Sequence, residues 1–464
     1  MDAQTQGDLH TPPNTDAQRT GRIESALSRR GFLRGAAVTG GGLIAASLAA
    51  CAPTSALPTW TYRPPTAGDP VGGAPSSAPS ALPAKSGAPV DCPIPSAAPA
   101  ASAMPAASHA PSGPIPAGWT QHDVDARTAL RRYLGNLVPG LKDIYGEAAS
   151  AKLAEIVGAA DNYPELKAKP SFAQVPQLVL NDTLTPLKPE LDGTVKVFRL
   201  TVDEIDHLID ELKPSVAALG YNKQWPGPTI RVTEGDQVRV VVTNNLKETT
   251  GVHFHGVLFD DFFQDGVPFV TQKPITPGET YTYEFTAGNT GSLMYHSHHN
   301  ATDQVGRGLL GAFIVDPKKP PVEDKVDHDY VWISNDSLGG FTINGHGFPA
   351  VLPVLAAKGE TVRIRFMNEG MMMHPWHVHG YVMKVIERDG RPLGTAAFEC
   401  DTLGVNPGER YDVLIKADRP GVWAFHCHIL PHVEGASGMF GMVSTLIVVP
   451  EKAHLDAIVN ALVS

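Results

Sequence analysis

The sequence GVHFHG at residues 251–256 returns 124 residues later as WHVHG at residues 376–380, and this repetition decides how the chain is organised. A second segment, MYHSHH at residues 294–299, returns 130 residues later as AFHCHI at residues 424–429. Flanking residues repeat at the same two offsets: Gly235, Val238, Arg239, Val240 and Asn244 match Gly359, Val362, Arg363, Ile364 and Asn368, and Pro277, Gly278, Glu279 and Tyr281 match Pro407, Gly408, Glu409 and Tyr411. A period of this length is too long for a solenoid and predicts a duplicated domain.

Short alternating runs fill each copy of the repeat. VRVVVTN at residues 238–244 and VRIRFMN at residues 362–368 alternate apolar and polar residues, and turns such as PGP, EGD, PGE and KGE separate such runs. This pattern is typical of antiparallel β-sandwiches. We therefore expect an all-β core of two sandwiches, at residues 196–317 and 327–450.

Four histidine pairs fall at matching places in the two copies. They are His253 with His255, His296 with His298, His377 with His379, and His426 with His428. Side chains at positions i and i+2 of a strand point to the same face, so each pair can present two imidazoles to one metal cluster. Four pairs in register across a duplication are a much stronger signal than any single His-x-His.

The second copy carries three further ligand-type residues. Cys427 lies between His426 and His428, His374 precedes His377 by three residues, and His432 follows Cys427 by five. In an extended segment Cys427 faces away from its two neighbours, so two metal centres would share one tripeptide. A Cys with two His and a distant Met is the ligand set of a blue-copper site.

The first copy lacks these three residues. The offsets place Thr250, Ser297 and Thr302 where the second copy has His374, Cys427 and His432. We therefore expect no blue-copper site in the first sandwich.

The motifs GVHFHG, MYHSHH, HPWHVHG and HCHILPH together resemble the four copper motifs of the multicopper oxidases, the family of laccases, ascorbate oxidase and ceruloplasmin. The resemblance covers both sandwiches and implies two cupredoxin-like Greek-key β-sandwiches of the two-domain, small laccase-like type. It implies four copper ions per active unit, one type 1, one type 2 and two type 3. Carried over by position, His374, Cys427 and His432 would hold type 1 copper, His253 and His377 type 2 copper, and His255, His296, His298, His379, His426 and His428 the type 3 pair.

Two features near these motifs leave alternatives open. The family's axial position, ten residues after the Cys, is Ser437 here; we expect Met439 to be the axial ligand, with Met442 as the alternative. Asp265, in QDGVP, resembles an acidic residue that many members place near the type 2 copper and could relay protons, although an ordinary turn aspartate fits nearly as well.

The run from Met371 to Met373 precedes His374. The favoured interpretation of this run is apolar packing at the rim of the site, and the alternative is a role in copper delivery.

The resemblance implies an oxidase that takes single electrons from a phenol or a metal ion at type 1 copper and passes them through Cys427 to His426 and His428, where O2 becomes water. Copper nitrite reductase is also built from two such sandwiches, but it carries its type 1 Cys in the first domain, where this chain has Ser297. A non-catalytic periplasmic copper-binding protein is the rival from another class. All ten family histidines and the Cys are present, which argues against it.

The N-terminal third has a different composition. Residues 1–51 are predicted to be a targeting segment. SRRGFLR at residues 28–34 resembles a twin-arginine export signal, and Leu48 to Cys51 resemble a lipobox in which Cys51 would be lipidated; a plain cleaved signal with a chance Cys is the alternative. The Pro-, Ala- and Ser-rich residues 52–117 read as a flexible linker, and residues 118–195 as a partly helical extension. We expect export to the periplasm or cell surface, with a lipid anchor through Cys51.

The charge and the cysteine count exclude other classes. The formal net charge of -11 without a long basic run gives no indication of nucleic-acid binding. Four cysteines, among them Cys92 within the linker, imply no disulfide framework.

The short link between the sandwiches also predicts an assembly. About ten residues join them, which favours a side-by-side arrangement with the copper faces turned to neighbouring chains. Head-to-tail contacts of that kind can close into a ring, and the resemblance to two-domain laccases implies a homotrimer with clusters between subunits.

Overall fold

The computed structural model describes residues 118–120, 123–124, 144, 146–157, 186–210, 214–321, 325–337, 340–435 and 438–463. The predicted signal, the linker with Cys92, and Cys51 lie outside the described residues. Within the expected helical extension, helix α5 spans Glu147–Val157, whereas residues 125–143 and 158–185 lie outside the described residues.

The first sandwich has two sheets. One contains β1 (Glu190–Asp192), β2 (Val195–His207), β5 (Gln237–Asn244) and β7 (Thr280–Thr286) in that order, with β3 (Val216–Tyr221) paired to β2. The other runs β4 (Gly227–Thr233), β9 (Leu310–Asp316), β8 (Gly291–Ser297) and β6 (Val252–His255). Two short helices lie in its loops, η4 (Phe262–Gln264) and α6 (Ala301–Gln304).

The second sandwich has two larger sheets. One runs β11 (Thr342–Ile343), β10 (His328–Asn335), β13 (Thr361–Asn368), β19 (Arg410–Lys416), β15 (Met383–Arg388) and β16 (Arg391–Pro392), with β17 (Phe398–Cys400) paired to β15. The other runs β12 (Val354–Ala357), β23 (Val443–Val449), β20 (Gly421–Cys427), β14 (His374–Val378) and β18 (Thr402–Val405). The remaining elements are η6 (Gly394–Ala396), η7 (Leu430–His432), and a hairpin of β21 (Glu434–Gly435) and β22 (Gly438–Met439).

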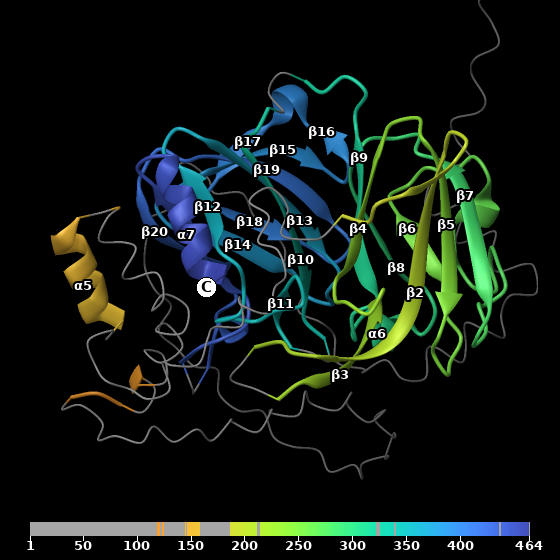
Figure 1. The fold of residues 1–464 in the computed structure, drawn as a ribbon, viewed down its shortest axis with the longest axis horizontal. Helices are drawn as coiled ribbons and strands as arrows, with labels where there is room; N and C mark the ends of the chain where they lie inside the picture. The colour runs from red at the N-terminus through yellow and green to blue at the C-terminus, as the bar shows by residue number, and fades with distance from the viewer. Residues whose placement is uncertain are drawn as a thin grey trace, which may run out of the picture. The chain divides into compact units, whose positions relative to one another are not determined.

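The two sandwiches share one strand plan, as the green and blue ribbons of Figure 1 show. In each, one sheet contains a parallel pair, β2 with β5 and β10 with β13, next to an antiparallel partner, β7 and β19. In the facing sheets, β4 pairs in parallel with β9, and β12 with β23. The predicted duplication of an all-β sandwich is therefore confirmed.

Each sandwich has its own apolar core. Phe198, Val240, Phe254 and Phe313 are fully buried between the sheets of the first sandwich, and Trp332, Phe366, Trp376 and Phe425 pack together in the second. Buried residues alternate with exposed or half-buried ones along β5, although the apolar Val241 lies on the outward face and the polar Asn244 is buried. This is the pattern that the sequence predicted.

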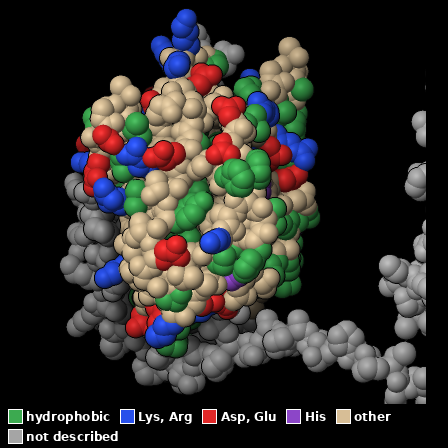
Figure 2. All heavy atoms as spheres, turned by 90° about the vertical axis from the view of Figure 1, so that its right-hand side faces the viewer, with side chains coloured by type: hydrophobic (Ala, Val, Ile, Leu, Met, Phe, Trp, Pro, Cys, Tyr) green, Lys and Arg blue, Asp and Glu red, His purple; other side chains and the backbone are tan. Residues whose placement is uncertain are grey.

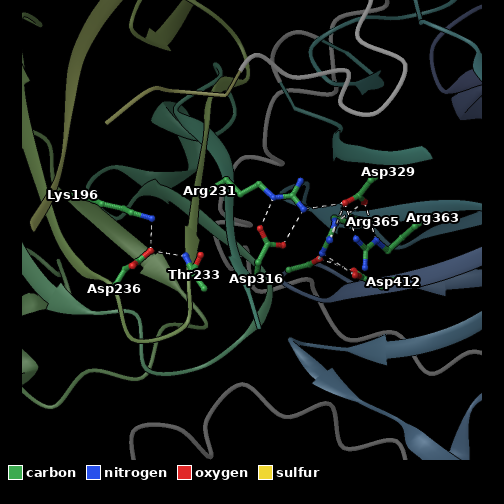
Figure 3. Close-up of polar contacts among 10 residues, drawn as sticks. Lys196, Arg231, Thr233, Asp236, Asp316, Asp329, Arg363, Arg365 and Asp412 are labelled. Atoms are coloured by element: carbon green, nitrogen blue, oxygen red, sulfur yellow. Dashed lines mark hydrogen bonds and ion pairs between the residues drawn. The ribbon is translucent and has the colours of Figure 1, made fainter. Parts of the chain in front are cut away.

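The sandwiches also pack on each other. A small apolar cluster joins Met294, Leu310 and Ile314 of the first to Val331 and Met367 of the second. Beside it lies a buried ionic network, drawn in Figure 3: the Arg365 guanidinium bonds both oxygens of Asp329, at 2.8 and 3.0 Å, and donates to Asp412 Oδ2 at 3.0 Å. Two contacts link this network to the first sandwich: Arg231 Nη2 lies 3.3 Å from Asp329 Oδ2, and Arg365 Nη1 donates to Ser292 Oγ at 2.8 Å. The two sandwiches are thus joined by both apolar and polar contacts.

One further helix follows the second sandwich. Helix α7, Ala453–Val463, lies beside β12 and buries Leu455 and Ile458 against the second core. The sequence reading did not anticipate it. Among the residues that the structure describes, no helix combines the length and apolar character required to cross a membrane.

Candidate metal centre

A Cys and two His meet inside the second sandwich. His374 begins β14, Cys427 ends β20, and His432 lies in the turn η7 that follows. The Cys427 sulfur lies 3.7 Å from His374 Nδ1 and 3.6 Å from His432 Nδ1, and the three ligand atoms lie within 4.8 Å of one another. All three side chains are buried. The arrangement is a buried nitrogen and sulfur donor set, the Cys and two His that blue-copper sites use.

Four histidines lie on the opposite side of the same two strands. His377 and His426 are directly opposed in the β14–β20 ladder. His379 Nε2 lies 3.1 Å from His426 Nε2, and the ring of His428 lies 5.5 Å from that of His377. His379 and His428 are exposed. Cys427 and its two neighbours therefore face opposite ways, as the alternation of a strand requires.

The first sandwich carries a matching group. His253 on β6 is opposed to His296 on β8, and His296 Nε2 lies 3.4 Å from His255 Nδ1. The ring of His298 lies 5.5 Å from that of His253. The group is half-buried except for His298, which is exposed.

Backbone carbonyls orient four of these rings. His253 Nδ1 lies 2.7 Å from Asp265 O, and His377 Nδ1 lies 3.0 Å from Asp401 O. His296 and His426 bond in the same way to the carbonyls of Ser297 and Cys427, both at 2.9 Å. A carbonyl can only accept, so each Nδ1 carries the proton and each Nε2 keeps a lone pair for a metal.

Burial favours the neutral form of these ligands. It lowers the pKa of His296 and of His432 to about 4, and burial together with the nearby Arg410 lowers that of His255 to about 3. Neutral imidazole is the form that binds metal ions. Burial raises the pKa of the Cys427 thiol to about 11, so a metal ion would have to displace its proton.

One positioning residue was missed by the sequence reading. The buried Asp336 carboxylate accepts bonds from His374 Nε2 at 3.1 Å and from the backbone amides of Met371 and Met372, both at 2.7 Å. It fixes the ring of His374 so that Nδ1 faces Cys427. Burial raises the pKa of Asp336, but the bond from His374 and the two amides outweigh it and lower the pKa overall. No spacing signal links Asp336 to a residue 38 positions away.

The remaining predicted residues differ in their surroundings. Asp265 lies beside His253, with Oδ1 3.4 Å from Nδ1. Met439 is 40% exposed on β22, whereas Met442 is fully buried in the second core. Ser437 lies outside the described residues. The run from Met371 to Met373 is exposed rather than packed inside.

The two groups of four histidines stay apart within the chain. Among the described residues, every ring contact that one of these eight histidines makes with another stays within its own group of four. The structure brings together each predicted half of the cluster and the predicted Cys and His site. The roles of these residues as copper ligands stay a prediction.

The fold and the donor sets define a copper protein of the cupredoxin class. Two sequence profiles, both described as multicopper oxidase, match residues 205–320 and 317–446. They follow each other along the two sandwiches and together cover about half of the chain. The chain belongs to the multicopper oxidase family. That family binds type 1, type 2 and type 3 copper ions, which the nitrogen and sulfur donors described above fit.

Similar proteins include both metal oxidases and laccases. The iron transport multicopper oxidase FET5 of Saccharomyces cerevisiae is 32% identical over 230 residues, 43% of this chain and 36% of that protein. A laccase of Cryphonectria parasitica is 32% identical over 50% of this chain and 44% of that protein. The chain thus spans less than half the length of these two curated relatives.

Solved structures agree with this assignment. The blue copper oxidase from Nitrosomonas europaea superposes with a TM-score of 0.53 at 34% identity, over 55% of this chain and 86% of that one. The multicopper oxidase mgLAC gives 0.52 at 38% identity, over the same shares. Both likenesses support the cupredoxin sandwich fold.

Proposed function

We propose that this protein is a laccase-like multicopper oxidase, which couples one-electron oxidation of a reducing substrate to the four-electron reduction of O2 to water. One observation carries the proposal. Cys427 reaches the buried site on one side of β20, while His426 and His428 face the other side, and His426 Nδ1 donates to the carbonyl of Cys427 itself at 2.9 Å. A single tripeptide therefore joins an electron-accepting site to an oxygen-reducing one.

Copper bound at these sites would supply reversible one-electron chemistry and a place for O2. The chain's own residues would hold the copper ions and orient their ligands. Cys427, His374 and His432 hold the accepting site, with Asp336 orienting His374, and Met439 is the proposed axial ligand. His253 and His377 would hold type 2 copper and the remaining six histidines the type 3 pair.

Oxygen reduction consumes protons, and one carboxylate is placed to deliver them. Asp265 Oδ1 lies 3.4 Å from His253 Nδ1. A carboxylate beside the cluster can pass protons from solvent to reacting oxygen atoms. Asp265 is therefore the proposed catalytic acid and base.

The substrate class is a small phenol or a metal ion. The laccases and the iron transport oxidase among the similar proteins support both classes. A steady-state comparison of a phenol, Cu(I) and Mn(II) as donors, with oxygen uptake as the readout, tests the proposal. Oxygen uptake with none of the three by the copper-loaded protein would refute it and favour a copper-binding protein without turnover. Reduction of nitrite, in contrast, would favour the nitrite reductase alternative, which the serine at position 297 of the first sandwich argues against.

The active form is proposed to be a homotrimer with clusters between subunits. Two observations support it. The two half-clusters lie apart in one chain and expose His298, His379 and His428. The loop after His255 also exposes Leu258, Phe262, Phe263, Phe269 and Val270, each more than half exposed. Figure 2 shows hydrophobic side chains gathered at several places on this face of the first sandwich, and such patches mark interaction surfaces.

Complementation tests the assembly. One chain lacking His253 and His255 is co-expressed with another lacking His377 and His379, each inactive alone. Because the intact first sandwich of one chain can meet the intact second sandwich of the other, mixed oligomers are expected to regain oxidase activity. Verified mixed oligomers without activity, or a fully active monomer, would contradict the proposal.

Export by a twin-arginine route, with lipidation at Cys51, remains part of the proposal and rests on the sequence alone. Release of the protein from membranes by Cys51→Ala, with unchanged export, is the expected result. Membrane association that survives this substitution would refute the anchor.

A further inference from the structure

The first sandwich contains a position equivalent to the buried copper site of the second. In the β6–β8 ladder Val252 opposes Ser297, and in the β14–β20 ladder Trp376 opposes Cys427. The two ladders therefore have the same register. Thr250, three residues before His253, occupies the place of His374.

Instead of metal ligands, a closed hydrogen-bond cluster fills this position. The side-chain carbonyl of Gln304 accepts from Ser297 Oγ at 2.6 Å and from Thr250 Oγ1 at 2.9 Å. The Gln304 amide donates to the carbonyl of Thr249 at 2.9 Å. Thr250, Ser297 and Gln304 are all fully buried. Because a buried polar group is costly without a partner, three satisfied groups at one place indicate a built cluster.

The cluster is tied directly to the histidine strand. Ser297 lies between His296 and His298, and its Oγ accepts the backbone amide of His299 at 3.3 Å. Its own amide donates to Leu309 O, and the amide of Leu309 donates to Gln304 O, both at 3.0 Å. Gln304 thus holds the end of β8 through both its side chain and its backbone.

We propose that Thr250, Ser297 and Gln304 are a metal-free counterpart of the type 1 centre, and that they position His296 and His298 for the trinuclear cluster. In the second sandwich a metal held by Cys427 would fix the His-Cys-His strand from behind. In the first sandwich these three polar side chains take over that task. The inference rests on the proposed function, because it assigns a purpose to an orientation of copper ligands.

The test compares copper binding by the full protein and by variants of this cluster. Ser297→Ala removes the hydroxyl that joins the strand to Gln304, and Thr250→Val removes the second hydroxyl with little change in shape. Both are expected to weaken copper binding at the trinuclear cluster by about 10- to 100-fold, the usual effect of losing a residue that orients metal ligands. The near-ultraviolet absorption of the coupled copper pair is expected to fall, while the blue absorption from the Cys427 site stays.

Two controls separate positioning from stability. Tyr330→Phe removes a buried hydroxyl with two backbone bonds to Leu355 in the second sandwich, at 3.1 and 3.0 Å, and is expected to lower stability without loss of copper. Thr250→Ser keeps the hydroxyl that Thr250→Val removes, and it is expected to bind copper as wild type does. If Ser297→Ala and Thr250→Val bind copper as wild type does, or lose it only as far as Tyr330→Phe does, the inference is wrong.

The copper content of the wild-type protein distinguishes failure of this inference from failure of the proposed function. Wild-type protein that binds no copper beyond the blue site would refute the proposed function. Wild-type protein with a full complement, together with unaffected variants, would refute only the positioning role.

Discussion

Arg365 lies at the contact between the two sandwiches, and its removal should destabilise the protein through the carboxylates that it leaves behind. Its buried guanidinium makes two bonds to Asp329, one to Asp412 and one to Ser292 Oγ, all between 2.8 and 3.0 Å. Arg365→Met keeps most of the side-chain volume but removes all four donors. Asp329 would keep Arg363 and Arg231 as partners. Asp412 would be left with only the Ser292 hydroxyl among the bonds described here.

The expected loss follows from this uncompensated carboxylate. Breaking a buried ion pair from one side costs about 3–5 kcal/mol of the free energy of unfolding. At about 2–4 °C for each kcal/mol in a folded unit of about 150–250 residues, the size range of the two sandwiches together, the thermal midpoint should fall by roughly 6–20 °C. Differential scanning calorimetry of the copper-free protein measures the change without interference from bound metal.

Two further variants make the test discriminating. Arg239, the repeat equivalent of Arg363, pairs with Asp192 and Glu284 on the outer sheet, and Arg239→Met should leave the midpoint close to that of wild type because water screens exposed ion pairs. The double variant Arg365→Met with Asp412→Leu should recover part of the loss, since no unpaired charge remains. An Arg365→Met protein as stable as Arg239→Met would refute this reasoning.

Three other predictions concern the copper sites and pH. Cys427→Ser should abolish the blue absorbance and substrate oxidation while copper remains at the other sites, because serine cannot supply thiolate charge transfer. A variant that keeps the blue absorbance in its visible spectrum would refute the assignment of Cys427 as the type 1 ligand. Met439→Leu should raise the type 1 potential measured by redox titration, whereas Met442→Leu should not, and the reverse result would move the axial ligand to Met442. Burial and the neighbouring Asp412 raise the pKa of Glu387 to about 7, so the folded state favours the neutral acid. Stability is then present at low pH and lost as pH rises toward 7. Melting curves at pH 5 and 8 should show that loss in wild type and not in Glu387→Gln; equal pH dependence would contradict it.

The repeat in the sequence was sufficient to predict the fold. The offsets of 124 and 130 residues put His253 on His377 and His296 on His426, and the two strand ladders have that register. Alternation along the strand then places the Cys427 side chain on the face opposite to those of His426 and His428. These inferences succeed because they depend on local backbone geometry and on residue spacing, both of which the sequence contains.

Contacts between segments distant in the chain could not be predicted from residue spacing. Asp336 approaches His374 across 38 positions, and Gln304 closes a site whose expected equivalent of His432 was Thr302. Arg365 and Asp329 look like ordinary residues of alternating strands, yet they lie in the contact between sandwiches. Each role depends on tertiary packing, for which a single sequence has no periodic signal.

The separation of the two histidine groups has a consequence for the dependence of the reaction on protein concentration. Cys427, His374 and His432 come together in one chain, whereas the two groups of four histidines, the proposed halves of the oxygen-reducing centre, make no ring contact with each other among the described residues. If the halves join between chains, a dissociated chain could accept one electron and then stop, because no oxygen-reducing site would be complete. By mass action, turnover on dilution would then fall faster than the number of chains, while the blue colour would fall only in proportion to it.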